Sequence, residues 1–135
     1  MEKKKPILCL DFDGVCHSYT SGWRGADVIP DPPVPGLWGF LILACDRFAV
    51  EVFSSRSHQP GGRNAMINWF GTHAPFAGPV TASESHISWY GDMVGLTFPT
   101  EKPPAFLTLD DRALTFDGTW PDITTLQEFK PWNKK

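Results

Sequence analysis

The feature that most constrains the fold of this chain is an apolar run, Ile7–Leu10, that ends in the stretch Asp11-Phe12-Asp13-Gly14. A strand that is apolar on both faces is typical of a parallel sheet. Side chains two apart on an extended backbone share one side, so Asp11 and Asp13 should lie together, with Phe12 directed to the core. Two adjacent carboxylates repel each other, and a divalent cation between them removes the conflict. A simple turn after the strand explains Asp13 and Gly14 but leaves Asp11 unexplained.

Strand-like and helix-like patterns alternate along the rest of the chain. We expect strands over Ile7–Phe12, Phe48–Phe53, Met93–Phe98, Phe106–Asp111 and Ala113–Phe116. Apolar residues at helical spacing predict helices over Leu37–Ala44, Arg63–Thr72 and Pro121–Phe129, whereas Pro75–Ser88 has no clear pattern. The alternation predicts an α/β fold, a three-layer α/β/α sandwich with a central parallel sheet, in one domain over residues 1–135.

Polar residues follow three of the expected strands, at Asp11–Asp13, Ser54–Arg56 and Asp110–Asp111. The carboxyl ends of parallel strands share one rim of the sheet, where ligands bind. Carboxylates from two strand ends suit Mg²⁺, which takes oxygen ligands and keeps waters or a phosphate in its shell. A serine hydroxyl and free backbone N–H groups suit an anion. Arg56 either contacts a phosphate, caps the helix layer or faces solvent.

Composition narrows the class of protein. The chain is 41% hydrophobic and 20% charged, as soluble globular proteins are, and no apolar run approaches the length of a membrane span. The basic N-terminus meets Asp11 too soon for a signal peptide, so we expect a cytoplasmic protein. The net charge is −3 and the basic clusters lie at the two ends, which argues against a broad nucleic-acid-binding face. The three cysteines match no zinc pattern, and we expect reduced thiols.

Four short motifs, in order, resemble those of the haloacid dehalogenase (HAD) superfamily. "LDFDGV" resembles its first motif, "VFSSR" its second, "EKPPA" its third and "LTLDDR" its fourth. Each follows or precedes the expected strand, and together they span Ile7 to about Phe116. Each motif alone is weakly specific, whereas four in the right order are strongly specific. "SSR" is also similar to the second motif of polynucleotide phosphatases in this superfamily.

The resemblance implies a magnesium-dependent hydrolase, a phosphatase. Asp11 would be the nucleophile and form an aspartyl-phosphate, and Asp13 would protonate the leaving oxygen and then activate water. An acid at Asp13 indicates phosphate chemistry, because the family's dehalogenases lack one there. Ser54, the Ser55 backbone and Lys102 would hold the phosphoryl oxygens.

The resemblance also implies a set of metal ligands. The Asp11 side chain, the Asp13 backbone carbonyl and an acid of the pair Asp110–Asp111 would hold Mg²⁺. We favour Asp111 as the direct ligand and Asp110 as its support, with Asp117 as an outside candidate. Gly14 would let the backbone turn closely past the phosphate.

Family members that act on selected small molecules usually carry a cap domain. Here Gly14–Pro33 has room for a flap hairpin, and Pro99–Glu101 has no room for an insertion, so we expect a capless member with an open site. Such a site admits a polymer end or a phosphorylated protein, or is closed by a neighbouring subunit. His17, Tyr19, Trp23 and Arg24 lie in the flap, where Trp23 either stacks on a base or anchors the flap. His58 is a weaker candidate for lining the site.

Several functions therefore remain open. A general phosphate-monoester phosphatase leads, and a nucleic-acid or nucleotide end-processing phosphatase is the alternative within the same superfamily. A non-catalytic binding module should lack one of the catalytic residues, and none is missing. A phosphomutase is less favoured because mutases usually need a cap to exclude water.

Overall fold

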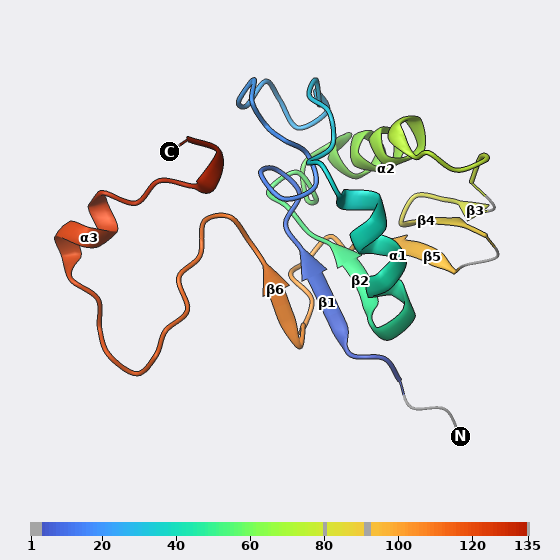
Figure 1. Ribbon diagram of the computed structural model, residues 1–135. Helices are drawn as coiled ribbons and strands as arrows, with labels where there is room; N and C mark the ends of the chain where they lie inside the picture. The colour runs from blue at the N-terminus through green and yellow to red at the C-terminus, as the bar shows by residue number, and fades with distance from the viewer. Residues whose placement is uncertain (1–3, 80, 91–92, 135) are drawn as a thin grey trace.

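The centre of the molecule is a six-stranded sheet. The computed structural model describes residues 4–79, 81–90 and 93–134. The strand order is β3-β4-β5-β2-β1-β6 (Figure 1). Four strands run parallel: β1 (Ile7–Leu10), β2 (Ala49–Val52), β5 (Val94–Thr97) and β6 (Leu107–Leu109). The remaining two, β3 (Thr81–Ala82) and β4 (His86–Trp89), are antiparallel to each other, and β4 is antiparallel to β5.

The structure confirms the α/β prediction, but the sheet is mixed, and only four of its six strands form the parallel sheet that the sequence predicts. The antiparallel strand β3 and most of β4 come from the region Pro75–Ser88, which has no clear sequence pattern. They form a tight hairpin in which Ser83 N–H donates to the His86 carbonyl at 2.8 Å. A strand of two residues is too short to produce a detectable alternation, so this hairpin left no periodic signal.

The expected strand over Ala113–Phe116 was also wrong. The chain turns away from the sheet after β6, where Arg112 N–H donates to the Asp110 carboxylate at 2.8 Å. The segment that follows protrudes from the body before it returns near the loop after β1 (Figure 1). Leu114 and Phe116 are therefore exposed, and β6 is the edge of the sheet.

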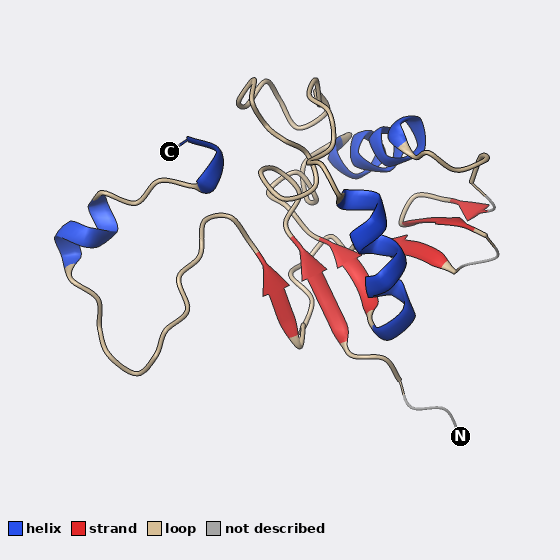
Figure 2. Ribbon diagram, viewed as in Figure 1, coloured by secondary structure: helices blue, strands red, loops and turns tan. Residues whose placement is uncertain are grey.

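The helices lie where the sequence predicts them, with small differences at their ends. The three helices are α1 (Leu37–Arg47), α2 (Gly62–His73) and the short α3 (Ile123–Gln127), and a 3₁₀ turn, η1 (Trp132–Lys134), closes the described chain (Figure 2). Helix α1 begins directly after Gly36, whose φ is 91°. That left-handed conformation is readily available only to glycine.

Both long helices pack on one face of the sheet. Register places the β1 residues Leu8 and Leu10 beside Val50 and Val52 on β2, and all four belong to one core with the buried side chains of α1 and α2. Right-handed crossovers from β1 to β2 and from β2 to β5 place their helices on the same side. Phe12 is fully buried in this core, as expected.

The second helical layer of the predicted sandwich is absent from the described residues. The connection from β5 back to β6 has to cross the opposite face of the sheet, and residues 98–106 make that crossing without a helix. This face carries Cys9, Glu51 and Thr108. The expected three layers were therefore wrong in this respect, because nine residues leave no room for a helix and two turns.

The flap is tied at its base. Ser18 N–H donates to the Pro32 carbonyl and Val34 N–H to the Cys16 carbonyl, at 3.0 and 2.9 Å. Residues 14–33 contain no helix, which agrees with the expected absence of a cap in this segment. Among the described residues, no helix has both the length and the apolar character that crossing a membrane requires. All three cysteines are free and buried.

Candidate active site

Three carboxylates converge at the carboxyl ends of two neighbouring parallel strands. Asp11 follows β1, and its N–H donates to the Leu109 carbonyl at 2.9 Å, which locks the ends of β1 and β6 together. Asp110 and Asp111 follow β6 directly. One oxygen from each of the three carboxylates lies within 4.8 Å of the others. The sequence prediction that these acids share one rim of the sheet is therefore met.

The geometry and electrostatics of this cluster are compatible with a bound cation. Burial raises the pKa of Asp11 to about 8, and the negative charge of Asp110 and a hydrogen bond with Asp111 act in the same direction. Asp111 Oδ1 is buried and has no hydrogen-bond partner among the described residues. An unpaired buried carboxylate oxygen costs free energy that a coordinated ion offsets. Three hard oxygen donors at this spacing fit Mg²⁺.

Asp13 is held by a buried arginine. Arg56 Nε lies 3.2 and 3.0 Å from the two carboxylate oxygens of Asp13, and Arg56 Nη2 lies 3.1 Å from Oδ1. Arg56 is fully buried, and the Asp13 side chain is 15% exposed. A fork of N–H donors on a carboxylate fixes its orientation as well as its position.

The rest of the guanidinium ties the flap to the same point. Arg56 Nη1 donates to the carbonyls of Gly25, Ala26 and Val28 at 2.8 to 3.1 Å. The plane of the guanidinium also lies under the Trp23 ring, with its Cζ 4.7 Å from the ring centroid. Arg56 therefore neither faces solvent nor caps the helix layer. It presents no exposed donor to a phosphate, and the sequence did not reveal its pairing with Asp13.

His17 supports Asp13 from the other side. The ring is fully buried, and Nε2 accepts the Asp31 backbone N–H at 3.0 Å. The proton of a neutral ring must then be on Nδ1, which lies 2.9 Å from Asp13 Oδ1 and donates to it. His17 thus positions Asp13 and does not face the opening of the site, although the sequence offered it as a flap residue. No histidine joins the acidic cluster among the described residues.

The remaining predicted residues are placed in different ways. Ser54 is buried two residues after β2, and its hydroxyl accepts the Arg56 N–H at 3.2 Å, whereas Ser55 is exposed. Lys102 is exposed on the connection that crosses the far face of the sheet. Burial raises the pKa of the Cys9 thiol on that face, the charge of Asp11 raises it further, and the charge of Lys102 lowers it. Asp117 lies on the protruding segment, and its carboxylate caps a local turn at Thr119. The roles of Ser54, Ser55 and Lys102 in phosphate binding stay predictions.

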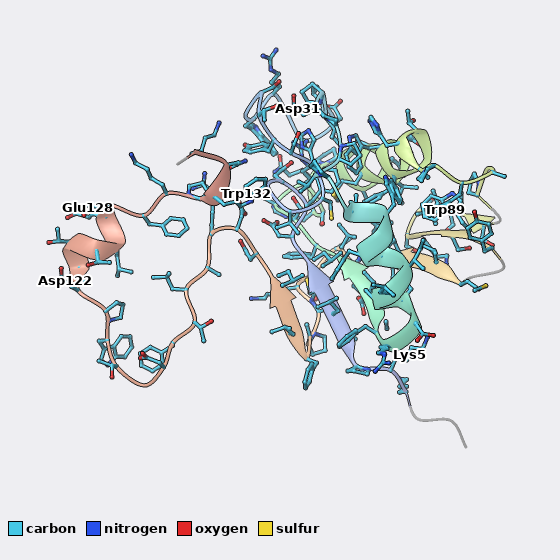
Figure 3. The ribbon with its side chains drawn as sticks, in the orientation of Figure 1. Lys5, Asp31, Trp89, Asp122, Glu128 and Trp132 are labelled. Carbon is cyan, nitrogen blue, oxygen red and sulfur yellow. The ribbon has the colours of Figure 1, made fainter. Side chains whose placement is uncertain are left out.

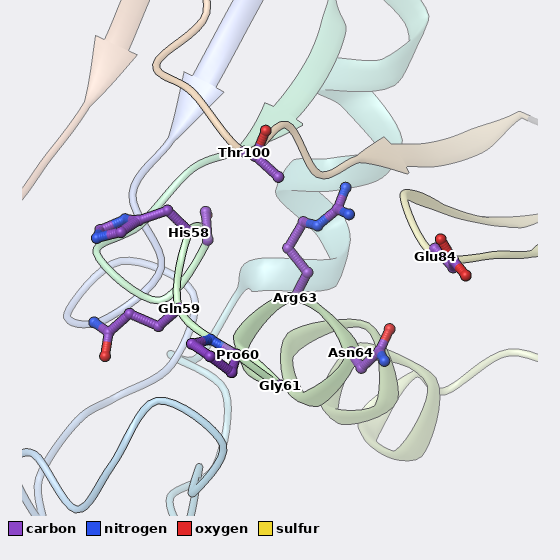
Figure 4. A pocket seen from close by; sticks show the side chains of 9 residues that line it. His58, Gln59, Pro60, Gly61, Arg63, Asn64, Glu84 and Thr100 are labelled. Atoms are coloured by element: carbon purple, nitrogen blue, oxygen red, sulfur yellow. The ribbon is translucent and has the colours of Figure 1, made fainter.

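A polar pocket of about 520 Å³ adjoins the second motif, and its lining residues are shown in Figure 4. It is bordered by the loop after β2, the first turn of α2 and Thr100 after β5. His58 lines this pocket, but the acids of the cluster do not, so the place of His58 beside the acidic site stays a prediction. Arg63 is anchored there by donating to the Phe98 carbonyl at 3.1 Å.

Sequence reasoning missed the contribution of the C-terminus. Trp132 Nε1 donates to the Gly14 carbonyl at 2.7 Å, and Asn133 Nδ2 donates to the Ser18 carbonyl at 3.0 Å. The residues that meet are more than a hundred positions apart, and neither contact has a local sequence signal. The C-terminal turn η1 therefore packs against the loop after β1 and holds it through these two hydrogen bonds.

No protein-family model, curated protein or solved structure matches this chain. The resemblance of the four motifs to those of the HAD superfamily therefore stays a prediction from the sequence.

Gly14 is the glycine on which the acidic cluster depends. Its φ is 84°, and a methyl group there would overlap Asp111 Oδ2. We expect Gly14→Ala to lower the free energy of unfolding by about 1–3 kcal/mol more than Gly22→Ala does, because only the first substitution adds overlap. Gly22 is the matched control, with φ 75° and no heavy atom within 4 Å of an added methyl. Urea titrations of the two variants measure the difference, and equal losses would contradict it.

We expect the stability of the folded chain to depend strongly on Arg56. We expect Arg56→Met to lower the free energy of unfolding by about 3–5 kcal/mol, because it leaves a largely buried carboxylate and three carbonyls without their donors. Arg24→Met, at an exposed arginine of the same flap, is the control and should change stability by less than about 0.5 kcal/mol. Denaturant titration measures both. A loss below 1 kcal/mol for Arg56→Met would show that the pair is dispensable.

Proposed function

We propose that this chain is a magnesium-dependent phosphatase with a HAD-like fold, which hydrolyses a phosphate monoester. The observation that carries the proposal is the convergence of Asp11, Asp110 and Asp111 within 4.8 Å at the ends of β1 and β6. The four parallel strands, with β1 between β2 and β6, support the fold assignment.

In the proposed reaction an oxygen of Asp11 attacks the phosphorus, and the ester oxygen leaves. The phosphoryl group is then carried by Asp11 as an acyl phosphate, and water attacks it to release inorganic phosphate and restore the carboxylate. Mg²⁺, held by Asp11 and by Asp111 or Asp110, would neutralise the phosphate charge and reduce the repulsion between nucleophile and substrate. Ser54 and Lys102 are the proposed partners of the phosphoryl oxygens.

Asp13 is the proposed proton carrier for both steps. It gives a proton to the departing alkoxide and later takes one from the attacking water. Its carboxylate is held in one orientation by Arg56 and His17. Ile7–Leu10 and Phe12 anchor the backbone on both sides of Asp11, since they are buried or nearly so.

A direct test measures the release of phosphate from an aryl phosphate ester with Mg²⁺, with EDTA, and after Mg²⁺ is added back. We expect activity that EDTA abolishes and Mg²⁺ restores. We expect Asp11→Asn to fall to background, because an amide cannot form the acyl phosphate. Asp122→Asn, at an exposed acid before α3, is the matched control and should keep full activity.

Equal activity of the wild type and Asp11→Asn would refute the mechanism. A wild type that binds inorganic phosphate in the presence of Mg²⁺ but never turns over an ester would indicate the non-catalytic module instead.

A second candidate function is the processing of phosphorylated nucleotide or nucleic-acid ends. It is favoured by the absence of a helical cap in residues 14–33 and by Trp23, which is 46% exposed beside Arg56. This function predicts a higher kcat/KM for a phosphorylated oligonucleotide than for ribose 5-phosphate. Initial rates with the two substrates measure the preference, and equal values would remove the reason for this candidate.

A further inference from the structure

The C-terminal turn braces the loop that carries the proposed catalytic acids. Residues 131–134 return to the body after the protruding segment, and Figure 3 labels Trp132 at this point of return. The turn contacts the loop after β1 at two places, through Trp132 at Gly14 and through Asn133 at Ser18. Pro131 is buried, and its carbonyl accepts the Lys134 N–H at 3.0 Å, which closes the turn.

The Trp132 ring lies next to the acidic site. Gly14 follows Asp13 directly, and its Cα lies so close to Asp111 that a methyl group would overlap the carboxylate. The indole nitrogen donates to the Gly14 carbonyl, and Trp132 is 52% exposed. An indole with one satisfied donor and an open face beside a polar site has an apolar surface available for a ligand.

Two further aromatic side chains border the same loop. Tyr19 has φ 61°, an unusual conformation for a residue that is not glycine. The Tyr19 ring packs edge-on against His17, with the ring centroids 5.9 Å apart, and His17 in turn contacts Asp13. Burial raises the pKa of Tyr19, and the charge of Asp13 raises it further. Trp23 covers Arg56. Aromatic surface thus borders the acids on the side of the flap and on the side of the C-terminus.

We propose that Trp132 is a specificity-determining residue that stacks on the base of a nucleotide or of an oligonucleotide end whose phosphate occupies the acidic site. The inference rests on the proposed phosphatase function. It adds the class of substrate, a nucleotide or an oligonucleotide end, and the residue that recognises its base. Base–aromatic stacking tolerates any base, since every base has a π face. In a site without a helical cap, the C-terminal turn then supplies the contact to the leaving group.

The charge around Trp132 agrees with this ligand. Lys130 and Lys134 flank it in the sequence and are exposed. They add positive charge at the C-terminal side of a protein whose net charge is −3. An oligonucleotide end brings further phosphates beyond the one that reacts, and exposed lysines next to a stacking ring suit such a chain.

The experiment compares adenosine 5′-monophosphate with ribose 5-phosphate, which differ only by the base. In wild type we expect a higher kcat/KM for the nucleotide. Trp132→Ala also removes the hydrogen bond to Gly14, so we expect kcat/KM to fall for both substrates. The fall should be about tenfold larger for the nucleotide than for ribose 5-phosphate, which is the usual size of a stacking contact. Trp120→Ala is the matched control, because Trp120 lies on the same C-terminal segment, is 85% exposed and packs against Phe116 of that segment.

Trp132→Phe separates stacking from the brace on Gly14. Phenylalanine keeps an aromatic face but has no N–H donor, so this variant should keep most of the preference for the nucleotide. Equal losses for both substrates in Trp132→Ala would overturn the proposal, since they would show a purely structural role. No loss for either substrate, or a Phe variant that loses the preference as fully as the Ala variant, would overturn it too.

A binding measurement separates this inference from the proposed chemistry. In ¹⁵N-labelled Asp11→Asn protein, the Trp132 indole N–H resonance is identified by its absence in a second, Trp132→Phe variant. We expect it to shift with adenosine 5′-monophosphate and Mg²⁺ and to stay in place with ribose 5-phosphate and Mg²⁺. A shift of the resonance in a wild type that turns over no ester would support the base site while the phosphatase proposal fails. Phosphatase activity without any base-dependent shift of this resonance would support the phosphatase proposal and overturn the base site at Trp132.

Discussion

The ion pair between Arg56 and Asp13 is the interaction on which the arrangement of the site depends. A guanidinium taken out of water costs several kcal/mol unless each of its donor groups finds a partner. Arg56 is fully buried, and its partners come from the loop after β1 and from the flap. The charge is compensated only when both segments are in place, so folding of the flap is coupled to folding of the first strand.

The same constraint reaches the second helix. A methyl group at Gly62 would overlap the Arg56 carbonyl, so only glycine allows α2 to begin this close to the arginine. Trp69 of α2 donates its indole N–H to the Asp31 carbonyl at 3.0 Å, and Asp31 in turn donates its N–H to His17. Helix, flap and strand loop therefore form one connected network of hydrogen bonds around Asp13.

The acidic cluster lowers the stability of this region, whereas the hydrogen-bond network around Asp13 raises it. Three carboxylates whose oxygens lie within 4.8 Å of one another destabilise one another without a cation. Burial is the largest cause of the raised pKa of Asp11, and the negative charge of Asp110 raises it further. The surrounding contacts keep the cluster in place. Phe12 lies 5.1 Å from the Trp69 ring centroid and anchors the backbone between Asp11 and Asp13. Trp132 holds the carbonyl of Gly14 from the opposite end of the chain.

The sequence by itself determined the α/β class, four of the six strands, the approximate helices and the acids at the ends of β1 and β6. These follow from apolar runs and helical spacing, which are local and leave a readable pattern. Only the tertiary structure decided the short β3–β4 hairpin, the single helical layer, the pairing of Arg56 with Asp13, the buried place of His17 and the return of Trp132 to Gly14. Each of these depends on contacts between segments distant in sequence, where burial and hydrogen-bond geometry select one partner among many and no local pattern records the choice.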